Sequence, residues 1–144
     1  YHHTAPVNAM YALHESLLIL KEEGLENSWQ RHQMHHNALV AGLEAMGLSM
    51  VVDKEYRLPQ LNLVSLPEGA DDAAVRAALL SEYSLEIGAG LGALAGKAWR
   101  IGLMGHACSK KNVLLCLSAL DNVLSAQGAK INSGAAVDAA LATY

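Results

Sequence analysis

Phenylalanine is absent from this chain of 144 residues, and aromatic residues make up only 5% of it. The hydrophobic content of 52% is nevertheless enough for a core, which must be built from Ala, Leu, Val and Met. The length corresponds to one domain. Cysteine is also scarce, because Cys108 and Cys116 are too few for a disulfide framework. This favours reduced thiols in a cytoplasmic protein.

Long runs of one kind of residue are missing as well. No apolar stretch approaches the length of a membrane span, and no long block of like charge occurs in a chain of net charge −4. These absences argue against a membrane partner and against a nucleic-acid partner. The chain shows no signal peptide and does not begin with methionine.

Apolar spacing and capping residues predict the order helix, helix, strand, strand, helix, strand, strand, helix. Thr4 is expected to cap the first helix, with Pro6 in its first turn, and Ser109 is expected to cap the last. The expected helices cover 4–23, 25–46, 71–83 and 109–127, and the expected strands cover 48–52, 60–66, 85–87 and 99–104. Separate strand pairs with helices on one face indicate an α+β fold with about four strands.

The stretch from Leu85 to Ala107 holds the candidate chemistry, because glycines at 88, 90, 92 and 96 separate two predicted strands. The backbone there can take positive φ and run close to a ligand. A dinucleotide-binding loop is excluded, since the helix that such a loop opens is replaced by a strand. We expect Gly88 to Gly92 to shape the wall of a small-ligand site.

Arg100 is the candidate ligand-binding side chain. In the second strand of this stretch Trp99 and Ile101 would point to one face, and Arg100 to the other, between two small residues. An arginine with open space beside it suits a planar anion bound bidentately. The alternative is a structural arginine paired with a local acid such as Glu86.

Two other groups of residues are candidates, one for metal binding and one for thiol chemistry. His32, His35 and His36 have helical spacing that a metal could use, but no acid is placed beside them. We therefore expect them to pack and to form hydrogen bonds. Cys116 falls on the buried face of a helix, where a thiol acts as a small apolar group, and Cys108 has little support as a nucleophile. We expect neither a metal site nor a catalytic thiol.

Four short motifs occur in order along the chain: YHHT followed by Pro6, GLENSW from Gly24, RLPQ from Arg57 and GKAWRIGLMG from Gly96. Together, from Tyr1 to about Gln127, they resemble the alanine–glyoxylate (serine–pyruvate) aminotransferases, a branch of the class V, fold-type I pyridoxal-phosphate enzymes. The resemblance implies the C-terminal portion of such an enzyme. The small domain of that family has a mostly antiparallel sheet with helices on its outer side.

The resemblance also implies roles for single residues. Arg100 would bind the substrate carboxylate, and Tyr1 and Thr4 would hold the phosphate of a cofactor bound mainly by the other subunit of a homodimer. It implies an interface segment and helix at 1–24 that lead from a missing N-terminal large domain, a small domain at 25–128, and an Ala-rich tail at 129–144 outside the resemblance. The implied reaction moves an amino group from alanine or serine to glyoxylate or pyruvate.

The Schiff-base lysine of that family is missing from this stretch. Pyridoxal-phosphate chemistry needs such a lysine and an acidic partner for the pyridinium nitrogen. No lysine of the chain stands in the family's S-x-K context, so the chain alone should be inactive. Two alternatives stay open: a lyase-type or desulfurase-type relative, the latter with a reactive loop cysteine, and a free-standing αβ module that binds small carboxylates.

Overall fold

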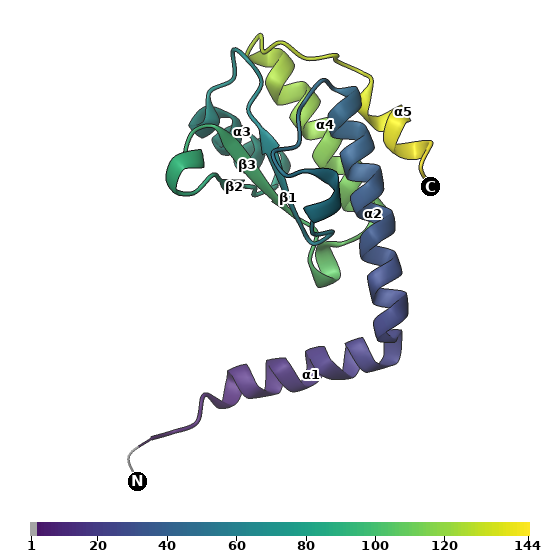
Figure 1. Ribbon diagram of the computed structural model, residues 1–144. Coiled ribbons are helices and arrows are strands. Elements are labelled where there is room, and N and C mark those ends of the chain that lie inside the picture. The colour runs from purple at the N-terminus through teal and green to yellow at the C-terminus, as the bar shows by residue number, and fades with distance from the viewer. Residues whose placement is uncertain (1–2) are drawn as a thin grey trace. The chain divides into compact units, whose positions relative to one another are not determined.

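The computed structural model describes residues 3–144 (Figure 1). The contacts between residues divide the chain into two compact units, and the boundary between Arg31 and His32 lies inside helix α2 (Leu25–Ala45). The first unit holds helix α1 (Val7–Glu23), which ends at Gly24 with a φ of 84°, and the start of α2. No residue of α1 is buried. Its exposed apolar side chains include Val7, Met10, Tyr11, Leu13, Leu17, Leu18 and Ile19.

The expected cap of the first helix is wrong. The residue that precedes α1 is Pro6, with a φ of −73°, and no side chain caps the helix. The ψ of Pro6 is 71°, which is not helical, so the helix starts at the next residue, Val7. The Val7 N–H is bonded to the Ala5 carbonyl at 2.8 Å, which leaves the N-cap position to proline rather than Thr4.

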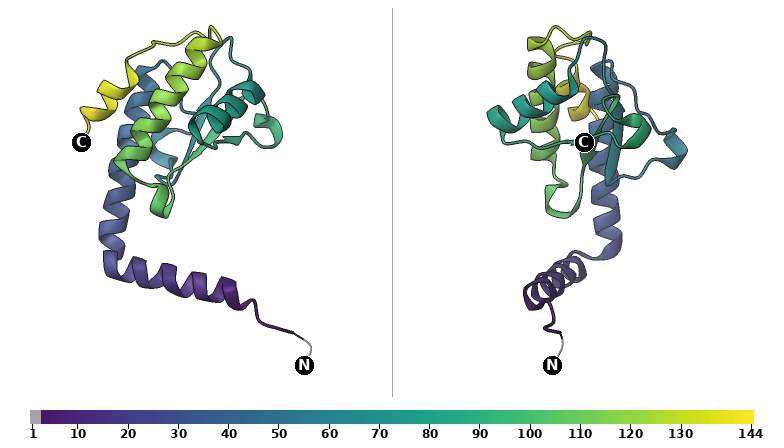
Figure 2. Two further views of the ribbon diagram at one scale, coloured as in Figure 1. Left: turned by 180° about the vertical axis from the view of Figure 1, so that it is seen from behind. Right: turned by 90° about the vertical axis from the view of Figure 1, so that its left-hand side faces the viewer.

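The second unit, 32–144, is the expected α+β layer structure. Strands β1 (Leu61–Ser65), β2 (Gly88–Ala89) and β3 (Ala98–Gly102) form one antiparallel sheet in the order β1-β3-β2. Helices α3 (Asp72–Tyr83) and α4 (Lys110–Ala126) lie behind this sheet in Figure 1 and in front of it in the reversed view of Figure 2. The rest of α2 and a short α5 (Ala136–Leu141) complete the unit.

The sheet has three strands among the described residues, where about four were expected. The segment expected as a strand at 48–52 makes one isolated bridge, between Met50 and Val64. Its Val51 N–H also bonds to the Leu63 carbonyl at 3.0 Å, so the segment runs beside β1. The backbone bends at residues 51 and 52, so the pairing ends before a full strand can form.

The strand expected at 85–87 is displaced by three residues. Ser84 adopts a left-handed conformation with a φ of 52°, and the Leu85 N–H closes the end of α3 on the Leu79 carbonyl at 3.1 Å. A donor used to cap a helix cannot pair in a sheet. Pairing with β3 therefore begins only at Gly88.

The core lies between the helices and the sheet and contains no phenylalanine. Trp99 is its largest fully buried side chain, and Ile101 and Leu103 follow it on the same face of β3. The expected alternation of this strand is thus confirmed. The indole Nε1 of Trp99 donates to the Asp72 carboxylate at 2.9 Å, which ties the sheet to the first turn of α3. Asp71 caps that helix by accepting from the Ala74 N–H.

The Ala-rich segment after residue 128 packs against the core. Ala136 and Ala140 of α5 are fully buried. The buried carboxylate of Asp121 holds the loop before α5, because it accepts from the Ser133 hydroxyl at 2.5 Å and from the Gly134 N–H at 2.7 Å. The expected short terminal helix is therefore present and attached to α4.

We predict that Gly42→Ala destabilises the protein, against the usual gain for alanine in a helix. A Cβ at Gly42 would clash with Leu117 and lie 2.9 Å from the Ala136 carbonyl oxygen, which is backbone. Helix propensity favours alanine by about 1 kcal/mol, but overpacking costs about 1–3 kcal/mol. Urea denaturation should show a net loss in the free energy of unfolding.

Leu117→Ala supplies the control for this prediction. In that background the clash with the Leu117 side chain is gone, so Gly42→Ala should cost less than it does in the unmodified chain. A stabilising effect of Gly42→Ala alone would contradict the packing seen between α2, α4 and α5.

Candidate functional site

Arg100 lies in the middle of the central strand, on the face of the sheet opposite to the core. Its neighbours across the sheet are Leu63 on β1 and Gly88 on β2. The side chains of Trp99 and Ile101 on either side of it are buried in the core, so alternation places Arg100 on the other face. Arg100 itself is half-buried. Sequence analysis placed it on this face, and the structure agrees.

The guanidinium of Arg100 is anchored to β2. Its Nε–H donates to the Ala89 carbonyl at 2.8 Å, and its flat group lies against Gly88. No carboxylate in the described part of the chain lies within ion-pairing distance of it. Glu86, the expected partner in the structural alternative, is exposed and lines a separate hollow together with Arg76. The Nη1 and Nη2 edge is therefore left for another anion.

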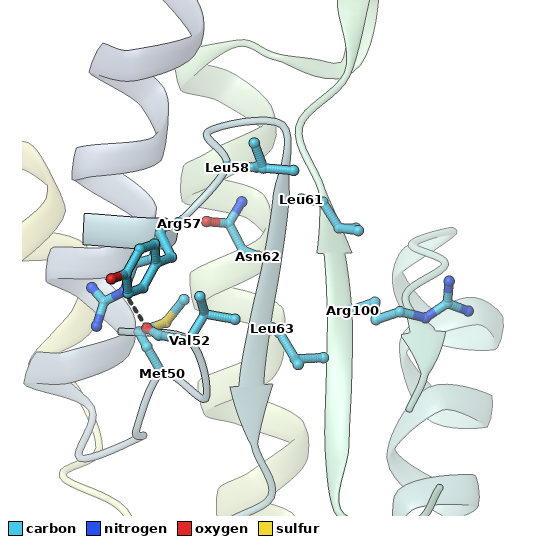
Figure 3. A pocket seen from close by; sticks show the side chains of 9 residues that line it. Met50, Val52, Arg57, Leu58, Leu61, Asn62, Leu63 and Arg100 are labelled. Carbon is cyan, nitrogen blue, oxygen red and sulfur yellow. Dashed lines mark hydrogen bonds between the residues drawn. The ribbon is translucent and has the colours of Figure 1, made fainter. Parts of the chain in front are cut away.

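A cavity of about 210 Å³ lies beside Arg100 on the same face (Figure 3). Its lining is mostly apolar and comes from β1, from Arg100 of β3 and from the segment before β1. In Figure 3 the guanidinium of Arg100 extends away from the other labelled side chains. The lining residues are Met50, Val52, Tyr56, Arg57, Leu58, Leu61, Asn62, Leu63 and Arg100.

Arg57, the other cation of this cavity, is already engaged. Its Nε donates to the Val52 carbonyl at 2.8 Å, and its Nη1 lies 3.4 Å from the Glu44 carboxylate. Arg57 thus fixes the loop before β1 to helix α2. Of the two arginines that line the cavity, Arg100 is the one without a carboxylate partner in the described chain.

The glycine-rich loop between β2 and β3 is shaped by its own backbone. A Cβ at Gly90 would clash with the Leu94 carbonyl, and Gly92 and Gly96 have φ values of 56° and 68°. A short 3-10 turn and then β3 follow, so no helix opens after these glycines. The exclusion of a dinucleotide-binding loop is confirmed.

The three histidines of α2 are structural. All are buried, and each has a hydrogen bond: the Gly105 N–H donates to His32 Nε2 at 3.2 Å, His35 Nδ1 lies 2.8 Å from the Tyr144 hydroxyl, and His36 Nδ1 lies 2.6 Å from Asn62 Oδ1. No group of three metal-ligating side chains occurs in residues 3–144. Packing and hydrogen bonding, as expected, account for these residues.

Both cysteines are free and buried. Burial raises the pKa of the Cys116 thiol to about 12, so this group stays protonated and cannot act as a nucleophile near neutral pH. Cys116 therefore serves as a small apolar group of α4, as its place on the helix predicted.

The expected cofactor residues lie at the start of the chain. Tyr1 falls outside the described residues. Thr4 is exposed just before α1, whose first N–H groups receive no side-chain cap. A hydroxyl near the start of a helix is the kind of group that suits a phosphate.

All lysines of the chain are exposed. None is buried in the way that suits an amine for covalent chemistry with a carbonyl group. Even Lys97, three residues before Arg100, projects from the exposed turn that precedes β3. The lysines are Lys21, Lys54, Lys97, Lys110, Lys111 and Lys130.

Sequence reasoning missed two contacts, one in the core and one at Arg100. The burial of His35 did not follow from the apolar stripe of α2, because its cover comes from Tyr144 at the far end of the chain, with ring centroids 5.5 Å apart. The anchor of Arg100 is a backbone carbonyl, which leaves no trace in the identity of Ala89. The run of small residues at 88–90 is the one sequence signal that indicated a close approach to this backbone.

Comparisons with known proteins give consistent results, although no family model matches the chain. The chain is 44% identical over 143 residues to (S)-ureidoglycine–glyoxylate transaminase of Bacillus subtilis, which is 99% of this chain and 34% of that protein. It is 42% identical over 125 residues to alanine–glyoxylate aminotransferase of Callithrix jacchus, which is 86% of this chain and 30% of that protein.

Solved structures show the same relationship. The ureidoglycine–glyoxylate aminotransferase of Bacillus subtilis superposes with a TM-score of 0.94 over 99% of this chain and 37% of its own. An alanine–glyoxylate aminotransferase from a Nostoc species matches with 52% identity and a TM-score of 0.82, over 86% of this chain and 33% of its own. The chain thus spans about a third of the length of the relatives it matches. The match to the Bacillus protein extends into residues 129–144, which sequence analysis had left outside the resemblance.

We predict that His36 makes the protein less stable at mildly acidic pH. Burial lowers the pKa of His36 below its ordinary value of 6.5, and the nearby charge of Arg57 lowers it further, while the hydrogen bond with Asn62 raises it. Below pH 6.5 the unfolded chain binds a proton that the folded chain does not, so stability falls as the pH drops through this range. The measurement is the free energy of unfolding in urea at pH 7.5 and 5.5.

His36→Asn is the matched control, since an amide can keep a hydrogen bond toward Asn62 but does not titrate. The loss of stability between the two pH values should be smaller in this variant. Equal losses in both proteins would show that His36 does not contribute to the pH dependence.

Proposed function

The chain belongs to the alanine–glyoxylate and ureidoglycine–glyoxylate aminotransferases, and from this we propose that it supplies the C-terminal part of such an enzyme, with Arg100 as the residue that binds the substrate carboxylate. The observation that carries the proposal is the position of Arg100. Its guanidinium is fixed by one backbone bond and leaves its two terminal nitrogens without a carboxylate partner in the described chain.

The reaction we propose is the transfer of an amino group from alanine or serine to glyoxylate or pyruvate. Each of these molecules carries a carboxylate next to the reacting carbon. One arginine can therefore hold the donor and then the acceptor in the same orientation, by two parallel N–H···O bonds. Arg100 binds and orients the substrate and transfers no proton, since an arginine keeps its charge at neutral pH.

The cofactor we propose is pyridoxal 5'-phosphate, as in a class V, fold-type I enzyme. When bound, it supplies an electron sink for the bond-breaking at the substrate α-carbon. Tyr1 and Thr4 would help to hold its phosphate, and the exposed position of Thr4 shortly before α1 supports this role. The exposure of every lysine of the chain supports a reactive lysine located in the part of the enzyme that this chain does not cover.

We further propose that the complete enzyme is a cytoplasmic homodimer, with the N-terminal large domain as the other partner of this chain. The apolar side chains along α1 are exposed, which is unusual for a surface that stays in water and typical of one that a protein partner covers. The two cysteines are free, which agrees with a reducing compartment. No helix among the described residues is long and apolar enough to cross a membrane.

The alternatives are less well supported. A desulfurase would need a reactive cysteine on a flexible loop, whereas both cysteines here are buried. A likeness to a NifS-like protein, at 24% identity and a TM-score of 0.61, shows a shared fold only. A free-standing carboxylate-binding module would keep the Arg100 site, but it would not need the exposed apolar surface of α1.

We predict that Arg100→Lys lowers kcat/KM of the complete enzyme for its amino donor by at least about tenfold. Lysine keeps the charge but loses the planar fork, and a charge-assisted pair of this kind contributes about 1.5–3 kcal/mol, of which 1.4 kcal/mol is a factor of ten. Pyridoxal-phosphate affinity should change little, because the phosphate binds elsewhere. Wild-type kcat/KM together with a lower Tm would instead mean that Arg100 is purely structural.

We also predict that the 144-residue chain, mixed with pyridoxal 5'-phosphate, alanine and glyoxylate, forms no glycine above the rate without protein. The chain lacks a buried lysine that could form a covalent bond with the cofactor. The assay is quantification of glycine, with Lys97→Ala as a control for the lysine nearest to Arg100 in the sequence. Glycine formation that Lys97→Ala abolishes would contradict the prediction.

A further inference from the structure

Two glycines flank Arg100, and they differ in what their missing side chains make possible. Gly88 faces Arg100 across the sheet, and a Cβ there would lie 3.1 Å from Nη2 and 3.3 Å from both Cζ and Nε of the guanidinium. Gly102 follows Arg100 on the same face of β3, and a Cβ there would contact only the Met104 methyl, at 3.8 Å. The space above Gly88 is therefore occupied by the Arg100 guanidinium, whereas the space above Gly102 is open.

We propose that Gly88 is a positioning residue for Arg100. The absent side chain lets the guanidinium lie flat on the β2 backbone, where Nε–H bonds to the Ala89 carbonyl. This inference rests on the proposed role of Arg100 and adds to it a residue that touches no substrate. Nothing in the backbone requires glycine at 88, because its φ is outside the left-handed region.

The contact distances explain why a larger residue at 88 would matter. Contacts of 3.1–3.3 Å between a Cβ and the guanidinium atoms are shorter than the van der Waals optimum, so the guanidinium would have to shift by a few tenths of an ångström away from Gly88. This shift would weaken the 2.8 Å bond between the Arg100 Nε–H and the Ala89 carbonyl.

The bond to Ala89 also decides which edge of Arg100 meets a ligand. A guanidinium offers carboxylates two bidentate edges, one formed by Nε with one terminal nitrogen and one formed by the two terminal nitrogens. Because Nε–H is taken by the Ala89 carbonyl, the second edge remains. Gly88 thus restricts the site to a carboxylate that approaches end-on along the arginine.

The test compares Gly88→Ala with Gly102→Ala in this 144-residue chain, by NMR of the arginine Nε–H signals. Arg100→Lys identifies the Arg100 signal, since it removes that signal from the spectrum. We expect slow exchange of the Arg100 Nε–H with water in the unmodified chain, because it is hydrogen-bonded. Gly88→Ala should shift this signal and speed its exchange by at least about tenfold, because loss of a hydrogen bond of about 1.4 kcal/mol corresponds to a factor of ten. Gly102→Ala should change the exchange rate by less than about twofold.

An exchange rate that Gly88→Ala leaves unchanged would overturn the proposal, and so would equal effects of the two glycine variants. Gly88→Ser provides a second substitution with the same Cβ, so that the result does not depend on one variant folding. Tm measured for each variant separates a local change at Arg100 from a general loss of structure.

Kinetics of the complete enzyme give the second readout. Gly88→Ala should lower kcat/KM for the amino donor by about tenfold in the Arg100 enzyme and by less than about twofold in the Arg100→Lys enzyme, because a residue that acts through Arg100 has no effect once the guanidinium is gone. Effects that simply add would overturn the positioning role.

The two readouts keep this inference separate from the proposed function. A displaced Arg100 in the NMR spectrum, together with unaltered kinetics of both Gly88→Ala and Arg100→Lys, would refute the carboxylate site and support the positioning. An undisturbed Nε–H together with a large kinetic effect of Arg100→Lys would refute the positioning of Arg100 by Gly88 and support the carboxylate site.

Discussion

The burial of Trp99 at the centre of β3 is the constraint on which the rest of the second unit depends. This side chain is fully buried, and its Nε1–H is satisfied by the carboxylate of Asp72. The hydrogen bond from Arg76 lowers the pKa of the Asp72 carboxyl most, and the hydrogen bond from Trp99 lowers it as well. The carboxylate that accepts from Trp99 therefore stays charged at neutral pH. Because side chains alternate along a strand, fixing Trp99 in the core places Arg100 on the opposite face.

Buried polar side chains form hydrogen bonds that link one element of the fold to another. His36 of α2 and Asn62 of β1 form the bond between a helix and the sheet, and Asp121 of α4 holds the loop before α5. In the described part of the chain no buried side-chain nitrogen or oxygen lacks a hydrogen-bond partner. An unsatisfied group there would cost about 1–3 kcal/mol. The hydrogen bonds of the buried histidines therefore account for their presence in α2, although their spacing in the sequence resembles that of metal ligands.

The Arg100 site on the open face of the sheet differs, because the terminal nitrogens of Arg100 have no carboxylate partner among the described residues. Arg100 has a backbone anchor and a mostly apolar cavity beside it. Such an arrangement can bind and orient an anion.

The sequence by itself determined the elements whose signals are local. The residues correctly predicted the period-two pattern around Trp99, the cap Ser109 and the end of the first helix before Gly24. These features depend on side chains within a few positions of each other, so a single sequence contains the whole cause. The face of Arg100 and the burial of Cys116 followed from the same periodicity.

Tertiary structure decided what depends on partners distant in sequence. The strand expected at 85–87 moved to Gly88 because Leu85 is used to close α3. The segment 48–52 makes a single bridge because its backbone bends at residues 51 and 52. The choice between Glu86 and an open Arg100 also needed the fold, since the deciding contact is a backbone carbonyl on another strand. Backbone acceptors are the same in every residue, so no sequence pattern marks which of them an arginine will find.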